Sequence, residues 1–218
     1  INFLKTGLGD LIKTGYNISK IDEQDKQIKL SFENNITKEC DYLIISDGVF
    51  SKSKSLISND QTKPKYNNTL AIRGIITKLP ENIDNKNISL FLGSNFHHVI
   101  YPINSHGDLN YIAIMKYSLS TDEQNKYLLF KKNSFVKKVL DKVPLATKNV
   151  LNNLDDIKIF PVFVSDDFYQ TKNNQIHLIG DAFFAFPPSF AQGASQSIEG
   201  AYELFENIEN NTESNFFR

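Results

Sequence analysis

A carboxylate beside a glycine-opened helix start is the feature of this sequence best suited to hold a polar ligand. The apolar run Ile176–Ile179 ends at Gly180 and Asp181, and Gln192–Ala194 begins an amphipathic helix. Open α/β sheets bind ligands at the carboxyl ends of their strands. Helix N-termini favour negative charge because their first N–H groups lack intrahelical acceptors. These residue types in this order predict a corner that holds a cofactor.

A second carboxylate follows another apolar run, because Tyr42–Ile45 ends at Ser46, Asp47 and Gly48. We interpret this turn as a second wall of the same ligand site. The alternative is an ordinary Asp-Gly turn, since that dipeptide commonly ends strands. The same alternative applies to Asp181, because Gly-Asp pairs and capping aspartates are frequent in turns.

Polar residues in the central part of the chain are candidates for binding a substrate. Arg73 suits a carboxylate, Tyr101 suits a phenol, and His98 lies near Tyr101 in the chain. Strand alternation puts Arg73 and Ile75 on one face, and Val99 and Tyr101 on another common face. The alternative is a solvated strand arginine and a packed tyrosine. No catalytic residue is assigned beyond these weak candidates.

Metal binding and nucleophilic catalysis find no support in the residue pattern. His97 and His98 lack metal-ligand spacing on one strand face, so no metal site is expected. His177 lies within an apolar run and is expected to be a hydrogen-bonded core residue. Cys40 is the only cysteine, which excludes an intrachain disulfide and indicates a reducing compartment.

The composition indicates a globular chain without an affinity for nucleic acid. The chain has 218 residues, 40% hydrophobic and 12% aromatic, with a formal net charge of -1. No basic surface is therefore expected for nucleic acid or anionic lipid. No apolar run reaches the roughly 18 residues of a membrane span, and we expect a cytoplasmic protein.

The periodicity predicts α/β pieces at both ends of the chain and an antiparallel sheet between them. Expected strands are Tyr16–Ile21, Gln27–Phe32, Tyr42–Ile45, Leu70–Thr77, Ile88–Leu92, Val99–Ile103, Tyr111–Tyr117, Ile157–Val164 and Ile176–Ile179. Expected helices are a short one that includes Phe3, Leu8, Leu11 and Ile12, then Ser51–Ile57, Thr121–Leu129, Ser134–Leu140, Leu145–Leu154 and one from Gln192. Thr121 and Gln124 fit a capping box. The last helix keeps one apolar face through Ala194, Ile198, Ala201, Phe205 and Ile208.

Two of these segments, taken together, resemble FAD-dependent monooxygenases of the aromatic hydroxylase type. Tyr42–Ser51 is similar to the family's Asp-Gly motif, an apolar strand followed by Ala-Asp-Gly, two residues and Ser. Ile179–Ala182, a proline pair and Gln192–Ala194 are similar to its second flavin motif of Gly-Asp-Ala, Pro and Gly-Gln-Gly. Between them, Ala71–Gly74 and His98–Pro102 resemble substrate-domain strands. The resemblance covers residues 1–208.

The resemblance implies a fold and a domain plan. The fold is α/β (α+β), with a Rossmann-like FAD-binding portion and an inserted antiparallel substrate-domain sheet backed by helices. Residues 1–66 are expected to be a partial FAD-binding domain, 67–165 the substrate-binding domain, and 166–218 the return of the FAD-binding domain.

The resemblance also implies the roles of the cofactor-binding residues. The carboxylate of Asp181 is expected to accept hydrogen bonds from the flavin ribityl chain, and Gly180 beside it is also a cofactor-binding candidate. The further cofactor-binding candidates are Gln192, Gly193 and Ala194 toward reduced flavin, Asp47 and Gly48 as a second wall, and Pro188, with Pro187, in the loop over the flavin.

The implied reaction uses FAD, with NAD(P)H as co-substrate. NAD(P)H reduces FAD, O2 adds at flavin C4a, and the hydroperoxide hydroxylates an aromatic or quinone-like substrate. A peripheral membrane location follows if the substrate is a quinone precursor. Two alternatives remain open: a non-catalytic or split remnant that acts as a binding piece, and a flavin-dependent reductase of the same fold.

The sequence departs from the family pattern at several positions. The family opens with a Gly-x-Gly-x-x-Gly turn, whereas Gly7-Leu8-Gly9 lacks the third glycine and a preceding strand. We therefore expect a missing N-terminal segment of about a hundred residues, or a complementary chain. Further differences from frequent family residues are Lys5 for Arg, Phe184 for His, Ala191 for Gly and Gly200 for Asp.

Overall fold

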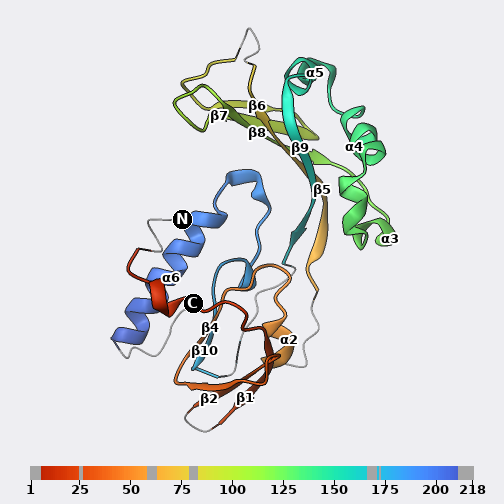
Figure 1. Cartoon of the computed structure of the whole chain (residues 1–218). Helices are drawn as coiled ribbons and strands as arrows, with labels where there is room; N and C mark the ends of the chain where they lie inside the picture. Colours follow the sequence, from red (N-terminus) through yellow and green to blue (C-terminus); the bar gives the residue numbers. More distant parts are fainter. Residues whose placement is uncertain are drawn as a thin grey trace. The chain divides into compact units, whose positions relative to one another are not determined.

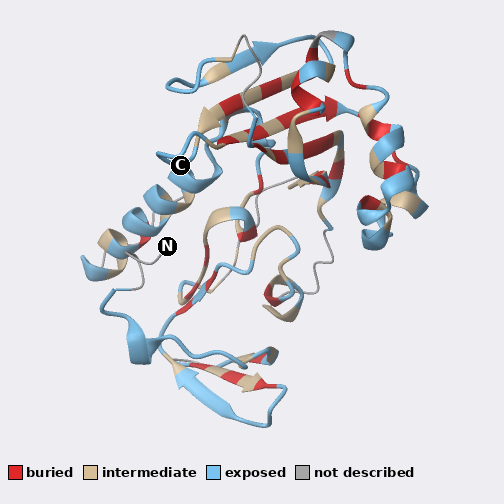
Figure 2. Ribbon diagram, turned by 45° about the horizontal axis from the view of Figure 1, so that its top comes forward, coloured by how far each residue is buried: buried red, intermediate tan, exposed pale blue. Residues whose placement is uncertain are grey.

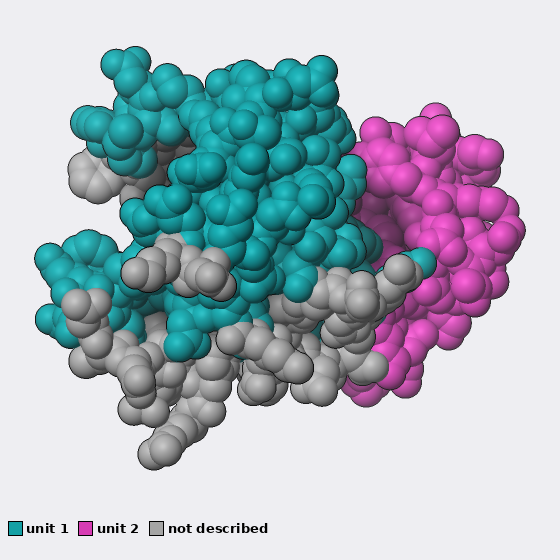
Figure 3. Space-filling view, turned by 90° about the horizontal axis from the view of Figure 1, so that it is seen from below, with its two compact units in different colours: residues 1–64, 165–186, 192–218 teal, residues 65–164, 187–191 magenta. Residues whose placement is uncertain are grey.

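The computed structural model describes residues 6–24, 27–57, 63–78, 83–165, 171 and 173–210 (Figure 1). The chain divides into two compact units, which Figure 3 shows in different colours. Unit 1 comprises residues 1–64, 165–186 and 192–218, and unit 2 comprises residues 65–164 and 187–191. Unit 2 is therefore inserted between segments of unit 1.

Unit 2 is built on an antiparallel sheet of five strands in the order β6-β7-β8-β5-β9. The strands are β5 (Lys65–Ile76), β6 (Ser89–Leu92), β7 (Phe96–Pro102), β8 (Leu109–Lys116) and β9 (Leu154–Val164). Short connections join β6, β7 and β8 into a meander, as the spacing of the apolar runs predicts. The long strand β5 then pairs with both β8 and β9.

One face of this sheet is covered by helices, and the main core lies between the two layers. The helices are α3 (Thr121–Gln124), η2 (Tyr127–Lys131), α4 (Asn133–Leu140) and α5 (Leu145–Leu151). Alternate strand residues such as Leu70, Ile72 and Tyr111 point into this core and are fully buried. From the helices, Phe135 and Val139 pack against them. Figure 2 shows the alternation of buried and less buried positions along the strands.

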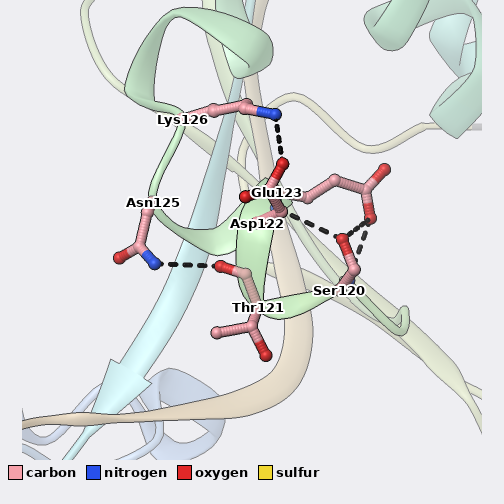
Figure 4. Close-up of polar contacts among 6 residues, drawn as sticks. All are labelled: Ser120, Thr121, Asp122, Glu123, Asn125 and Lys126. Atoms are coloured by element: carbon pink, nitrogen blue, oxygen red, sulfur yellow. Dashed lines mark hydrogen bonds and ion pairs between the residues drawn. The ribbon is translucent and has the colours of Figure 1, made fainter.

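The start of α3 differs from the expected one by one residue. Ser120, not Thr121, is the N-cap: its Oγ accepts from the Glu123 backbone N–H at 3.2 Å. The Glu123 carboxylate accepts from the Ser120 backbone N–H at 2.9 Å (Figure 4). Ser120 is the cap, and not Thr121, because Ser120 has the extended backbone conformation that an N-cap requires. The expected helix to Leu129 is also wrong, since α3 ends at Gln124 and a separate 3-10 turn follows.

Unit 1 contains two small sheets and one long helix. The antiparallel sheet has the order β1-β2-β3, with β1 (Ile18–Glu23), β2 (Ile28–Phe32) and β3 (Thr37–Cys40). The parallel sheet pairs β4 (Leu43–Ile45) with β10 (Ile176–Leu178). The remaining elements are η1 (Gly9–Leu11), α2 (Ser53–Ile57), η3 (Gly180–Ala182) and α6 (Gly193–Glu209). Strand β3 was not expected, because Thr37–Cys40 is mostly exposed and polar.

The last helix, α6, does not bury the apolar face that its periodicity predicts. Ile198 is 66% exposed and Phe205 is 56% exposed, and Tyr202 beside them is 60% exposed. Leu204 is the buried apolar residue of the helix. Figure 2 shows α6 as largely exposed. The described part of unit 1 therefore leaves this apolar stripe uncovered.

Other local expectations were met in outline or corrected. Ile44 in β4 is 46% exposed, so the run Tyr42–Ile45 is not a fully buried strand. The helix expected near Leu8–Ile12 is only the single turn η1. Lys5 lies outside the described residues. The fold as a whole is mixed α/β, with parallel and antiparallel sheets.

Candidate functional site

The parallel pairing of β4 with β10 brings the two predicted carboxylate turns to the same sheet edge. Ile45 is opposite Leu178 in the register, so both strands end together. The Ile179 backbone N–H donates to the Ile45 carbonyl at 3.0 Å and extends the pairing by one residue. Asp47 and Asp181 therefore follow neighbouring strand ends. This is the edge at which α/β sheets bind ligands.

Gly180 is required for the turn after β10 on two grounds. Its φ is +58°, in the left-handed region that side chains other than glycine rarely adopt. A Cβ at this position would also lie 2.9 Å from the Ser197 Oγ on α6. The missing side chain thus lets the η3 turn pack directly against the long helix. Ser197 is a site residue that the sequence reasoning missed.

The N-terminus of α6 is open to an anionic or hydrogen-bond-accepting group. Gln192 is the N-cap, but its side chain makes no capping hydrogen bond, and the first turn has no acidic residue. Gly193 and Ala194 are exposed. The first N–H groups of a helix need acceptors from outside, and the helix dipole favours negative charge there. The geometry suits the role predicted for Gln192–Ala194.

Asp181 is an exposed carboxylate in the η3 turn. Within the residues that the structure describes, no hydrogen bond or ion pair engages it. Nor does it cap α6, whose N-cap makes no side-chain bond. No contact among the described residues therefore supports a capping role for Asp181. Its carboxylate can accept hydrogen bonds from a ligand.

Asp47 differs from Asp181 because it is already engaged within its own turn. Its Oδ2 accepts from the Ser53 backbone N–H at 3.1 Å, at the start of α2. Burial raises the pKa of Asp47, but hydrogen bonds from Ser51 and Ser53 outweigh it and hold the pKa below its usual value. Gly48 has a φ of +86°, which allows the tight turn. Ser51 and Ser53, four and six residues after Asp47, are the sequence signal for this capping contact at the start of α2.

The proline loop belongs to unit 2. Pro188 begins the 3-10 turn η4 (Pro188–Phe190), which ends at Ala191 with a φ of +52°. This conformation is the one that the glycine frequent at this position would adopt without strain. Pro188 thus belongs to unit 2, whereas the two carboxylate turns belong to unit 1.

The substrate candidates Arg73 and Tyr101 lie on the same face of the five-stranded sheet. Arg73 and Val99 are both opposite Ile112 on β8, and directly opposed residues share a face. Tyr101 is two residues from Val99 and points the same way. The expectation of two separate faces is therefore corrected to one, which lies opposite the helix-covered face.

His98 is the exception among the substrate candidates. It points to the helix-covered side of the sheet and is 5% exposed, whereas Arg73 is exposed on the other side. Alternation along β7 explains the split, because His98 and Val99 are neighbours in one strand. The structure thus brings Arg73 and Tyr101 to one face and separates His98 from them.

The other residues singled out in the sequence are packed against their neighbours or partly buried. His177 is half-buried and stacks on Tyr42 with ring centroids 6.2 Å apart. Burial lowers the pKa of His177, although a hydrogen bond with the Asn174 backbone opposes this shift. Phe184 contacts Phe186 edge to face at 4.7 Å. Cys40 is a free thiol, and burial raises its pKa.

Comparison with protein families gives one match across most of the chain. Residues 16–212 match the family model described as an FAD binding domain. Zeaxanthin epoxidase of an Oncidium hybrid cultivar is 22% identical in an alignment that covers 92% of this chain and 30% of that protein. A salicylate hydroxylase of Pseudomonas putida is 24% identical in an alignment that covers 87% of this chain and 48% of that protein. The chain spans less than half the length of these curated relatives.

Solved structures share the fold at low sequence identity. Klebsiella pneumoniae HpxO, complexed with FAD and uric acid, has a TM-score of 0.71 at 17% identity and covers 93% of this chain and 51% of its own. A salicylate hydroxylase substrate complex has a TM-score of 0.69 at 19% identity, covering 93% and 55%. Among the described helices, none is both long and apolar enough to cross a membrane.

Proposed function

This chain belongs to the family of FAD-binding monooxygenases, and we propose that it forms the flavin-and-substrate portion of an aromatic hydroxylase that uses NAD(P)H and O2. The observation that carries the proposal is the sheet edge after β4 and β10, where an unengaged Asp181 lies in a turn packed on α6. The sequence alone predicts the residues; the parallel register supports their placement at one edge.

The residues at this edge fit the flavin end of FAD. The Asp181 carboxylate would accept hydrogen bonds from ribityl hydroxyls, and charged acceptors strengthen such bonds. The N–H groups at Gln192–Ala194 would stabilise negative charge on the reduced ring, because a helix N-terminus carries partial positive charge. Asp47, held ionised by Ser51 and Ser53, would keep the neighbouring turn in one conformation.

Bound FAD supplies the redox chemistry, which takes a hydride from NAD(P)H and delivers one oxygen atom from O2 to the substrate. The protein residues would bind and orient the flavin and the substrate, and they would exclude water from the site. The face of the five-stranded sheet opposite the helices is the proposed substrate surface, with Arg73 toward a carboxylate and Tyr101 toward a phenol. Apolar neighbours such as Val99 and Ile112 give this face the character that an aromatic ring requires.

The adenylate end of FAD needs a further segment, and unit 1 offers surfaces that suit one. The pair β4 and β10 is a two-stranded parallel sheet within the described residues, and such a sheet is normally buried and wider. Next to it, α6 exposes Ile198, Tyr202 and Phe205. We propose that a strand–turn–helix segment with a glycine-rich turn covers these surfaces, either in the same polypeptide or in a separate one.

Flavin binding by the chain tests the cofactor part of this proposal. Titration with FAD and with riboflavin, followed by flavin fluorescence, should give dissociation constants within about threefold of each other, because the chain contacts the flavin end. A preference for FAD of a hundredfold or more, about 2.7 kcal/mol, would show that these residues also hold the adenylate. Failure to bind either flavin would contradict the proposed site.

Activity tests the reaction. The flavin-loaded protein, with the covering segment supplied, should consume O2 when NADH or NADPH and salicylate, as the probe aromatic acid, are both present. The product should be one oxygen atom heavier by mass spectrometry. Oxidation of NAD(P)H that reduces the substrate without oxygen incorporation would favour the reductase alternative.

A further inference from the structure

Unit 2 contains a cavity on the helix-covered side of its sheet, away from the proposed substrate face. Its volume is about 870 Å³, within the range of small-molecule sites. It lies between the edge strand β6, its neighbour β7 and the helix α5. Apolar lining comes from residues such as Phe91, Phe96 and Val150, and polar lining comes from His98, Thr147 and Asn149.

His98 is the residue that gives this cavity a chemical character. Its ring stacks between Phe91, at 4.4 Å, and Tyr111, at 5.5 Å, with Phe96 against its edge. Within the described residues, its Nδ1 is buried without a hydrogen-bond partner. A sealed Nδ1 leaves Nε2 as the ring nitrogen that is available to a ligand. The imidazole is thus fixed in position by aromatic rings with its hydrogen-bonding capacity unused.

The surroundings determine which state of His98 faces the cavity. Burial, with a smaller contribution from His97, lowers the pKa of His98 to about 4, so the ring is neutral at pH 7. An unpaired buried N–H is costlier than an unpaired buried acceptor. The proton of the neutral ring is therefore best placed on Nε2, away from the sealed Nδ1. His98 can then donate one hydrogen bond toward a ligand.

We propose that this cavity is a binding site for a neutral aromatic molecule that carries a carbonyl group. The carbonyl would accept from His98 Nε2–H, and the ring would pack among Phe91, Phe96 and Val150. Charged ligands are disfavoured, because no lining residue among those that the structure describes carries a full charge to pair with them. The site is separate from the proposed flavin edge, which lies in unit 1, and it stands without the proposed reaction.

A matched pair of probes tests the site in the full 218-residue chain. The probes are 1-indanone, which has a carbonyl, and indane, which has the same ring system without it. By isothermal titration or ligand-observed NMR, 1-indanone should bind about tenfold more tightly than indane. Benzoate should not bind here. Equal affinity for 1-indanone and indane, or no binding of 1-indanone up to its solubility, would overturn the proposal.

Three variants locate the binding. His98→Phe keeps the aromatic stack and should weaken 1-indanone about tenfold while leaving indane unchanged. His97→Phe, on the opposite face of the same strand, is the matched control and should change neither. Asn149→Trp, at an exposed lining position, should block both probes. Unchanged 1-indanone binding in both His98→Phe and Asn149→Trp would contradict the site.

A wild-type measurement keeps the test independent of whether the variants fold. Titration with 1-indanone should shift the imidazole ¹⁵N resonances of His98 while those of His97 stay in place. Indane should shift them far less. Resonances of His98 that do not respond to saturating 1-indanone would overturn the proposed hydrogen bond.

Discussion

The two units of this chain bury their apolar residues to very different degrees. In unit 2, the five-stranded sheet and its helices enclose fully buried residues such as Leu70, Ile72 and Val139. In the described part of unit 1, the parallel sheet has two strands, and α6 exposes Ile198 and Phe205. A domain is stable when its layers cover one another's apolar faces. The difference indicates that unit 2 covers its own core, whereas the described part of unit 1 leaves apolar surface exposed beside the proposed cofactor edge.

The largest expected effect is a difference in stability between matched truncations in the two units. Leu70→Ala removes a fully buried side chain from unit 2 and should lower the free energy of unfolding by about 2–5 kcal/mol. Ile198→Ala on α6 should change it by less than about 0.5 kcal/mol, because that side chain is exposed. Denaturant unfolding monitored by circular dichroism measures both. Similar losses would contradict the contrast between the units.

The next largest effect tests the contact between η3 and α6 at the proposed cofactor edge of unit 1. Gly180→Ala places a Cβ at positive φ and 2.9 Å from the Ser197 Oγ, so it should cost about 1–3 kcal/mol. Gly200→Ala is the matched control, since a Cβ there meets nothing within 4 Å. That control should stabilise α6 by up to about 1 kcal/mol, because alanine is the better helix former. The melting temperatures of the two variants measure the difference. Equal destabilisation by Gly180→Ala and Gly200→Ala would count against the η3–α6 contact.

The capping role of Asp47 predicts a pH-dependent effect of intermediate size. Asp47→Asn should lower stability by about 0.5–1 kcal/mol at pH 7, as the loss of a charged cap does. The pKa of Asp47 is held below its usual value, so its contribution is present above the ordinary carboxyl pKa and is lost as the pH falls through the lower folded-state pKa. Urea unfolding of both proteins from pH 7 to pH 2 should therefore show their difference shrinking below about pH 4. A difference that is constant with pH would exclude this role.

The smallest effect concerns the proline loop of unit 2. Ala191 has a φ of +52°, which costs an alanine about 1 kcal/mol relative to glycine. Against this, the larger entropy of glycine stabilises the unfolded chain by a smaller amount, about 0.4–1 kcal/mol. Ala191→Gly should therefore change the melting temperature by no more than a few degrees, in the stabilising direction. A clear loss of stability would mean that the backbone strain at this position is smaller than its φ implies.

The sequence predicted most strands and the motif residues, but not the way they share faces and edges. Apolar runs located β5 and β8, because burial imposes alternation on a strand. Periodicity also marked the apolar stripe of α6, yet it cannot tell whether a partner covers that stripe. The contact of Asp47 with Ser53 is local and has a sequence signal, whereas the surroundings of His98 come from rings on neighbouring strands, a register that no local pattern encodes.

The most direct test of the account is riboflavin binding by the wild-type chain and by Asp181→Ala. The wild type should quench flavin fluorescence on binding, and Asp181→Ala should weaken binding about tenfold, near 1.4 kcal/mol for a charge-assisted hydrogen bond. The control is Asp84→Ala, which changes an exposed turn aspartate in unit 2. This variant should bind riboflavin as the wild type does. Equal binding by wild type and Asp181→Ala would contradict the assignment of this edge to the flavin.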